Sequence, residues 1–273
     1  MPHALTELRL TAAGFVDASG DAALTWMAGL PCWVPERPIY GSQQVIVEHV
    51  DEDHKPDPGA IDLAIAARAG ELGLLRRGGL AFFFPGRGTA VLNVTHIEAP
   101  LDPVAASRAK LAGKAQADAA IALLREEFPR AFGRARVRAY GYPGRRQTRW
   151  IKGRHQLTVD EVRAGTRFGD AVARTAWPIE LHDRPEGYVW EMFGPDHVHY
   201  VPLRSMTPPD VHNVMAAGRC IDGDAAALSS VRVMGPCAAM GAAAAHALDL
   251  AGGGSTHDVD LGRLRERLAA NLD

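Results

Sequence analysis

The chain has 273 residues, with 30 Lys and Arg against 32 Asp and Glu, and a formal charge of −2 at pH 7. This balance excludes a protein that binds nucleic acid through a strongly basic surface, and a hydrophobic content of 47% excludes an intrinsically disordered chain. The cysteines Cys32, Cys220 and Cys237 lie far apart, so we expect neither a disulfide framework nor a cysteine-ligated zinc. With no apolar signal-peptide core and no stretch long enough to span a membrane, we expect a cytoplasmic protein.

The first predicted elements are a short strand and a helix. Phe15–Ala18 is predicted as a strand that ends in a turn of small residues, and Asp21 is predicted to cap a helix that runs to Met27 and stops at Gly29. A strand this short and apolar is typical of one buried on both faces of a parallel sheet.

The middle of the chain is predicted to mix hairpins with helices. In chain order, we expect a strand over Gln43–His49, a helix over Gly59–Leu75, a hairpin of Leu80–Phe84 and Thr89–His96, a helix over Pro103–Phe128, strands over Arg136–Tyr140 and Gln147–Leu157, and a second hairpin of Tyr188–Met192 and His197–Leu203. Asp102 is the predicted N-cap of the long helix, and Thr158 with Glu161 forms a capping box that opens a shorter one.

The last part of the chain repeats the strand–turn–helix pattern of the first. Val211–Ala217 is predicted as a strand, Met234–Leu250 as an Ala-rich helix and Asp258–Leu272 as a terminal helix. A strand that ends in small residues and leads to a helix N-terminus presents free backbone N–H groups, which favour an anion. One such unit alone indicates only an ordinary crossover, but the pair favours a cofactor site formed by the two chain ends. We therefore expect Phe15–Ala18 and Val214–Ala217 to lie side by side, in one sheet or in adjoining layers.

Six segments of the sequence resemble the motifs of a known protein family. They are, in chain order, Val16–Asp21 (V-D-A-S-G-D), Arg146–Gly153 (R-Q-T-R-W-I-K-G), Leu157–Val162 (L-T-V-D-E-V), Tyr200–Ser205 (Y-V-P-L-R-S), Asn213–Ile221 (N-V-M-A-A-G-R-C-I) and Ser230–Gly241 (S-V-R-V-M-G-P-C-A-A-M-G). Together they resemble FAD-dependent oxidoreductases with the glutathione-reductase-like flavin fold, which are related to fumarate reductase flavoproteins. The ordered set covers roughly residues 15–251.

The resemblance implies an α/β fold of mixed α+β character with FAD as cofactor. Residues 1–33 and 205–273 would form a partial FAD-binding layer, and residues 34–204 an inserted substrate or cap domain with antiparallel strands. The implied FAD contacts are Ala18, Ser19, Gly20 and Asp21 towards the ADP part, Gly218, Arg219 and Asp222 along the ribityl chain and pyrophosphate, and Arg232, Val233, Met234 and Gly235 beside the isoalloxazine ring. The helix that begins near Met234 would point its positive end at the flavin O2.

The implied activity is hydride or electron transfer between a small organic substrate and the flavin. The candidates for orienting or protonating the substrate are Arg146, His199, Tyr200 and Arg204. Arg146 belongs to a basic run that is consistent with a solvated strand, a pyrophosphate contact or a bidentate contact to a substrate carboxylate. His197 and His199 favour a structural pair over a metal site because no third ligand is apparent, so we expect no metal.

The sequence departs from the family pattern in four places. Gln147 stands where the family has Glu, Gly241–Ala245 (G-A-A-A-A) stands where the family has G-Q-A-A-G, the loop from Asp222 to Ser229 lacks the family's histidines, and no G-x-G-x-x-G segment is present. We therefore expect that about the first third of a complete family member is missing, that the strand over Phe15–Ala18 has an open edge, and that the chain retains FAD weakly and forms oligomers or binds a partner chain carrying the missing segment. The alternatives are a non-catalytic fragment or scaffolding subunit, and a generic small-molecule-binding α/β protein.

Overall fold

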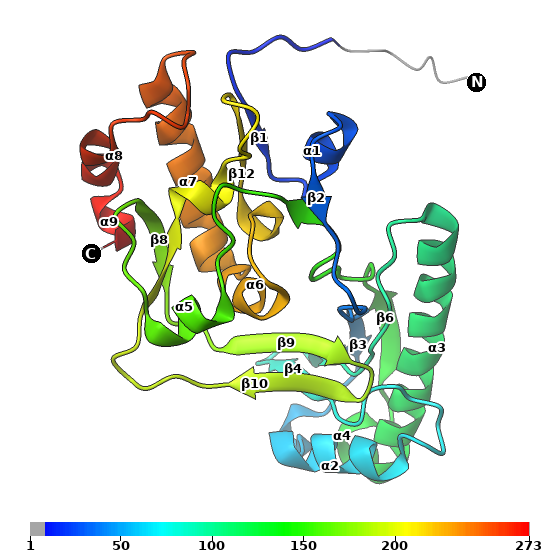
Figure 1. Cartoon of the computed structure of the whole chain (residues 1–273). Coiled ribbons are helices and arrows are strands. Elements are labelled where there is room, and N and C mark those ends of the chain that lie inside the picture. The colour runs from blue at the N-terminus through cyan, green and yellow to red at the C-terminus, as the bar shows by residue number, and fades with distance from the viewer. Residues whose placement is uncertain (1–8, 273) are drawn as a thin grey trace. The chain divides into compact units, whose positions relative to one another are not determined.

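The computed structural model describes residues 9–272 (Figure 1), and the chain divides into two compact units. Unit 1 combines residues 9–33, 149–177 and 193–272, and unit 2 combines residues 34–148 and 178–192. Residues 149–177 and 193–204, which we predicted within the inserted domain, thus fold together with the two ends of the chain. Helices, antiparallel sheets and one parallel strand pair confirm the predicted mixed α/β class.

Unit 2 is built on an antiparallel four-stranded sheet of order β4-β5-β3-β6. Its elements are β3 (Val45–Glu48), η1 (Glu52–His54), α2 (Pro58–Arg68), β4 (Leu80–Phe84), β5 (Thr89–Asn93), α3 (Pro103–Glu127), α4 (Pro129–Phe132), β6 (Arg136–Tyr140), β9 (Ile179–Arg184) and β10 (Gly187–Glu191). Alternate residues of the central strands, such as Val47 and Leu92, form one buried core with apolar residues of α2 and α3, such as Ile65 and Leu124.

Several predictions for unit 2 are confirmed. The hairpin β4–β5 forms, β6 has the predicted bounds, and the Asp102 side chain accepts a hydrogen bond from Ala105 N at the start of α3. Helix α2 is shorter than predicted. It ends at Arg68 because the chain turns between Gly70 and Gly73, and Gly73 adopts a φ of +64° that other residues avoid.

Unit 1 contains three two-stranded sheets and most of the short helices. Its elements are β1 (Phe15–Asp17), α1 (Ala23–Met27), β2 (Cys32–Trp33), β7 (Trp150–Ile151), α5 (Val159–Ala164), β8 (Ala171–Thr175), β11 (His199–Pro202), η2 (Leu203–Met206), β12 (Val214–Ala216), η3 (Gly218–Cys220), α6 (Ala225–Val231), α7 (Met234–Ala251), α8 (Leu261–Arg267) and α9 (Ala269–Leu272). The predicted side-by-side arrangement of the two end strands is confirmed, because β1 and β12 pair in parallel. The capping box of Thr158 and Glu161 at the start of α5 is confirmed as well.

The second predicted hairpin is wrong. β10 pairs with β9, and β11 pairs with β8, so the two predicted partners belong to different units. The strands β8 and β9 were not predicted. β9 directly precedes β10 and pairs with it, whereas β11 pairs with β8, which is more distant in sequence than β10. Two smaller differences also occur: the strand predicted over Gln147–Leu157 is reduced to β7, and the terminal helix is broken into α8 and α9 at Leu268.

The start of unit 1 differs from prediction in two details. Val16 is 38% exposed, so β1 is not buried on both faces, and within residues 9–272 it pairs with β12 alone. Asp21 does not cap α1, because Ala22 takes the N-cap position in a left-handed conformation. The first-turn N–H groups of α1 are instead bound by the Ser19 hydroxyl, at Ala23 N, and by Asp17, at Thr25 N.

Among the described helices, none alone has the length and composition to cross a membrane. The consecutive helices α6 and α7 satisfy that test only when taken together, and they meet at a 90° bend.

Candidate functional site

The carboxyl ends of β1 and β12 form the candidate site of unit 1. Parallel strands carry their ligands at this edge, where the following turns expose backbone groups. The turn after β1 runs from Ala18 to Ala22, and the turn after β12 runs from Ala217 to Cys220. Figure 1 shows β1 and β12 side by side, and their register pairs Asp17 with Ala216. The sequence therefore brings Ala18, Ser19, Gly20, Asp21, Gly218 and Arg219 together, as their predicted shared role requires.

Asp17 is the residue that organises the first turn. Its carboxylate is 2% exposed and accepts hydrogen bonds from Ser19 N (3.2 Å), Ser19 Oγ (2.6 Å), Thr25 N (2.8 Å) and Thr25 Oγ1 (2.7 Å). Burial alone would raise the pKa of this carboxyl, but the bonds from Ser19 and Thr25 lower it below its ordinary value. Asp17 is thus a buried anion that fixes the turn and the start of α1.

Cys220 joins the two turns. Its sulfur lies 3.0 Å from Gly20 N and 3.4 Å from Ala22 N, and accepts hydrogen bonds from both. Burial raises the pKa of the Cys220 thiol to about 11, so the sulfur is a neutral thiol at neutral pH. Cys220 therefore serves as a structural hydrogen-bond acceptor. Its pKa is raised, whereas the pKa of a reactive cysteine is lowered.

Arg219 makes a second connection between the turns. Its Nε donates to Gly20 O at 2.6 Å and its Nη2 contacts Asp21 Oδ1 at 3.2 Å. A Cβ atom on Gly20 would lie 2.4 Å from this guanidinium, and Gly20 has a φ of +81°, so only glycine fits there. Arg149 Nε also donates to Asp21 O at 2.9 Å. The two turns thus form one cross-linked unit before any ligand is present.

The N-terminus of α7 lies against the second turn. A Cβ atom on Gly218, which has a φ of +68°, would lie 3.4 Å from Cys237 Sγ in the first turn of α7. Val233, the N-cap residue, makes no side-chain cap, and Met234 is 90% exposed. A Cβ atom on Gly235 would meet nothing within 4 Å. The first N–H groups of a helix have no partner within it, so this end of α7 offers accessible donors and a positive dipole end.

Two further residues that the resemblance assigns to the cofactor, Asp222 and Arg232, lie outside these two turns. Asp222 is buried and accepts from Gly153 N at 2.7 Å and Gln156 Nε2 at 3.3 Å. Burial raises the pKa of its carboxyl above the ordinary value, although these bonds oppose the shift. Asp222 therefore holds the segment after β7 in place. Arg232 is the C-cap residue of α6 and lies directly before Val233.

His199 is fully buried, and both of its ring nitrogens have partners. Nε2 lies 2.8 Å from Ser230 Oγ, and Nδ1 lies 3.2 Å from His197 Nε2. The Ser230 hydroxyl donates to Trp177 O at 2.6 Å, so it must accept from His199 Nε2. Burial, and secondarily the charge of His197, lowers the pKa of His199 to about 4, so the imidazole is neutral. Its placement connects β11 to α6.

The other candidates for substrate chemistry also have structural partners. Tyr200 is buried on β11, with Arg167 stacked over its ring at 5.3 Å. Arg204 is 45% exposed and forms an ion pair with Asp170, with Nε 3.0 Å from Oδ2. Because this guanidinium reaches solvent while its backbone N–H also binds Asp170, Arg204 has a fixed position with an accessible face.

Arg146 belongs to unit 2, whereas the other three candidates belong to unit 1. Its Nη1 donates to Tyr40 O at 2.7 Å and its Nη2 to Ser42 Oγ at 3.1 Å. Arg146 thereby connects the segment before β7 to the segment before β3.

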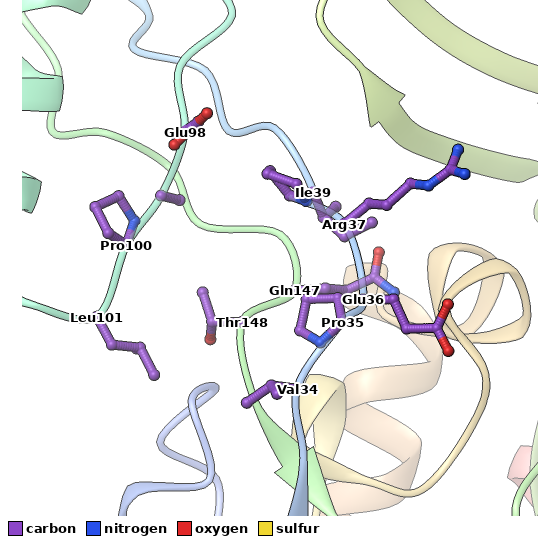
Figure 2. Close-up of a pocket in the computed structure, with 12 residues that line it drawn as sticks. Val34, Pro35, Glu36, Arg37, Ile39, Glu98, Pro100, Leu101, Gln147 and Thr148 are labelled. Atoms are coloured by element: carbon purple, nitrogen blue, oxygen red, sulfur yellow. The ribbon is translucent and has the colours of Figure 1, made fainter.

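A cavity of about 340 Å³ lies beside this segment of unit 2. Figure 2 shows Thr148 between Leu101 on one segment and Pro35 on another, with the Glu98 carboxylate on the same segment as Pro100 and Leu101. The walls are largely apolar, and the buried residues Gln147 and Thr148 supply polar groups. This combination is typical of a site for a small organic molecule.

The sequence reasoning missed three residues that hold the candidate site of unit 1 together, namely Asp17, Cys220 and Arg149. Asp17 had a usable signal, since a carboxylate at the end of an apolar strand must be satisfied by nearby donors. Cys220 and Arg149 lie within two of the segments that carry the resemblance, but their structural partners were not predictable, because these lie about 200 and 130 positions away. Within residues 9–272, no cluster of three or more His, Cys, Asp or Glu side chains is arranged to hold a metal ion.

Comparison with known proteins gives one match. The chain matches the family described as FAD dependent oxidoreductase over residues 3–268. No curated protein and no solved structure matched the chain. Because the family match spans nearly the whole sequence and agrees with the ordered motifs, this chain belongs to the FAD dependent oxidoreductase family, and its cofactor is FAD.

Proposed function

We propose that this chain transfers hydride or electrons between a small organic substrate and FAD, with the flavin ring at the N-terminus of α7. The observation that carries the proposal is the accessible first turn of α7 beside the cross-linked turns of β1 and β12. Negative charge is stabilised at a helix N-terminus by about 0.3–1 kcal/mol, and by more when the site is partly buried.

The residues present fit the flavin end of FAD. Gly235 leaves open space where a flat ring needs to approach the backbone, and the N–H groups of Met234 and Gly235 supply donors for its pyrimidine oxygen. Arg232, immediately before the N-cap, adds a positive charge near this position. When bound, FAD supplies the acceptor for a hydride or an electron pair.

The chain's own residues hold this site in shape. Asp17 and Cys220 fix the turn after β1, and Arg219 fastens that turn to the turn after β12. The donors of α7 are thus presented by a support that needs no rearrangement on binding, which lowers the entropic cost of holding the ring.

We propose the cavity beside Gln147 and Thr148 as the substrate site of unit 2. Its apolar walls suit the carbon skeleton of a small molecule, and the Thr148 hydroxyl and the Gln147 amide suit a polar substituent. Arg146, directly before Gln147, does not line this cavity; its guanidinium binds Tyr40 O and Ser42 Oγ and so holds the segment that carries Gln147.

The experiment is a flavin titration of the purified full chain, with Arg232→Ala as the variant. We expect a bound flavin spectrum for the wild type, and for Arg232→Ala a weaker flavin affinity with an unchanged melting temperature. A variant that melts several degrees lower and keeps its flavin affinity would assign Arg232 to the fold instead.

Two further proposals concern partners. The parallel pair of β1 and β12 leaves β1 with a single strand neighbour among the described residues, and this supports a partner chain or a second copy that pairs there. A colourless chain that becomes yellow only when mixed with a polypeptide carrying a G-x-G-x-x-G segment would support the partner chain. A chain that stays colourless in that mixture would favour the alternative of a non-catalytic scaffolding subunit.

A further inference from the structure

Unit 2 contains a buried chain of two histidines and one glutamate. His96 follows β5, and His182 and Glu180 lie on β9, while both imidazoles are at most 2% exposed. His96 Nδ1 lies 2.9 Å from Pro185 O, and His96 Nε2 lies 3.1 Å from His182 Nδ1. His182 Nε2 lies 2.9 Å from Glu180 Oε1. The four ring nitrogens thus form a continuous chain of contacts, with an oxygen acceptor at each end: Pro185 O beside His96 and Glu180 Oε1 beside His182.

Counting protons along this run gives a definite result. A carbonyl oxygen can only accept, so His96 Nδ1 carries a hydrogen and donates to Pro185 O. Burial lowers the pKa of His96 to about 4, so this ring is neutral at neutral pH and its Nε2 is an acceptor. His182 Nδ1 must then donate to His96. The remaining contact, between His182 Nε2 and Glu180, requires a third proton.

The surroundings decide which residue holds that proton. The Glu180 side chain is partly exposed, and Arg76 attracts it electrostatically, so both solvent and charge stabilise the carboxylate form of Glu180. His182 has the carboxylate on one side and the lone pair of His96 on the other, and both favour a doubly protonated ring. Two neutral rings would leave a nitrogen lone pair facing a carboxylate oxygen.

We infer that His182 is a buried imidazolium paired with Glu180 on the same strand, and that its charge strengthens the His182–His96 hydrogen bond, which attaches the β9–β10 hairpin to the rest of unit 2 as a proton-dependent latch. The latch is the set His96, His182 and Glu180. Figure 1 shows the hairpin as two long neighbouring arrows, and it is the part of unit 2 that is separate in sequence from residues 34–148.

Both histidines take part in the attachment of the hairpin. His182 O accepts from Tyr40 N at 2.8 Å, and His96 donates to Pro185 in the hairpin turn. Arg77 N donates to Glu186 O at 2.8 Å at the same turn. The imidazolium contact is the charged member of this group, and hydrogen bonds to charged groups are the stronger ones.

Charged and titratable groups elsewhere in unit 2 act on the latch. On the face of His182, the Tyr188 ring of β10 is stacked at 4.8 Å, and Arg76 lies 5.4 Å from the centre of that ring. Tyr40 is stacked on His96 at 5.6 Å, with Glu98 and Glu186 acting on its hydroxyl, and Arg146 acts on His96. Arg76 and Arg146 disfavour the imidazolium, so the charge of His182 depends on Glu180.

The sign of the pH dependence follows from the two rings. An unfolded histidine loses its proton near pH 6.5, whereas folded His182 keeps it, so the stability contributed by His182 falls as the pH rises above that value. His96 has the opposite sign, because its pKa is lowered: its contribution is present above about pH 6.5 and is lost as the pH falls towards 4. The latch is therefore strongest over a middle range of pH. At alkaline pH it weakens, because neutral His182 still donates to His96 but without a charge, and its Nε2 lone pair then faces the Glu180 carboxylate.

The first test measures the charge in the wild-type chain. Nitrogen-15 NMR of histidine-labelled protein at pH 7 should show one ring with both nitrogens protonated, and His182→Gln assigns that signal. In Glu180→Gln, the amide N–H can donate to His182 Nε2, so the ring should become neutral. A His182 ring that is neutral at pH 7 in the wild type would overturn the inference.

The second test measures attachment of the hairpin. Hydrogen exchange of residues 179–191, corrected for the intrinsic effect of pH, should become at least about tenfold faster in His182→Gln, and in the wild type at alkaline pH. Glu180→Gln should keep the hairpin protected at alkaline pH, because its latch needs no charge. His155→Gln removes another His–Glu contact, in unit 1, and serves as the matched control. Equal exchange in His182→Gln and in the control would refute the latch.

Discussion

Gly235→Val provides a direct test of where the flavin binds. Gly235 is the second residue of α7, its φ is not in the left-handed region, and a Cβ atom there would meet nothing within 4 Å. A valine side chain therefore meets no other part of the protein, but Pro236 follows, and its ring disfavours the helical backbone at a preceding residue that carries a Cβ atom. The free energy of unfolding should therefore fall somewhat, and the thermal melt measures this loss separately from the loss of flavin affinity.

The same side chain fills the space in front of the exposed helix N-terminus. If the flavin is bound there, oxidised FAD loses a hydrogen bond to its neutral pyrimidine oxygen, worth about 0.5–1.5 kcal/mol. This corresponds to a dissociation constant roughly 2- to 12-fold higher. The assay is titration of the full chain with FAD, followed by flavin fluorescence, beside a thermal melt of each variant.

Gly241→Val is the matched control. Gly241 lies on the same helix, is exposed, and would also place its Cβ more than 4 Å from any neighbour. We expect Gly241→Val to bind FAD as the wild type does. If both variants bound FAD equally well, or if Gly235→Val bound it as tightly as the wild type, the flavin could not lie at this end of α7.

Three further predictions concern residues that hold unit 1 together. Asp17→Asn should lower the free energy of unfolding by about 3 kcal/mol, because an amide nitrogen would face the donors of Ser19 or Thr25. Since the pKa of Asp17 is lowered, the stability that its carboxylate contributes is present above about pH 4 and is lost in more acidic solution. Urea unfolding at pH 7 and pH 3 should therefore show a smaller loss of stability in acid for the variant than for the wild type. Cys220 should resist alkylation by iodoacetamide at pH 8 in the folded chain and react after denaturation, because its pKa is about 11; rapid labelling of the folded chain at Cys220 would contradict the assignment. Because the pKa of His199 is lowered to about 4, the wild type should lose about 3 kcal/mol more stability than His199→Gln between pH 7 and pH 4, and parallel pH profiles of unfolding would count against a neutral buried ring.

The sequence predicted local structure well wherever the signal was local. The cap at Asp102, the capping box at Thr158 and the hairpin β4–β5 each depend on residues within a few positions of one another, and each is present. The pairing of β1 with β12 was predictable because both strands end in the same kind of turn. By contrast, β11 pairs with the more distant strand β8, and the sequence pattern alone favoured the nearer strand β10.

The proximity of several predicted site residues could be inferred from the sequence for a similar reason. Motif resemblance located Ser19, Gly20 and Arg219, and the structure brings them together. Burial was not predictable from the motifs. His199 was chosen for its imidazole, yet its neighbours surround it completely, and only the packing of β11 against α6 determines that.

The pairing of Phe15 with Val214 has a consequence for the order in which this protein is made. During synthesis, β1 leaves the ribosome about 200 residues before its only described strand partner exists. Meanwhile residues 34–148 can form the sheet and core of unit 2, because their contacts lie within that segment. Domains generally fold as units during synthesis, and distant strand pairing is slow. The apolar N-terminal segment should therefore remain unpaired for most of translation, and a chain stalled before residue 214 should bind chaperones through residues 9–33 while unit 2 is already resistant to protease.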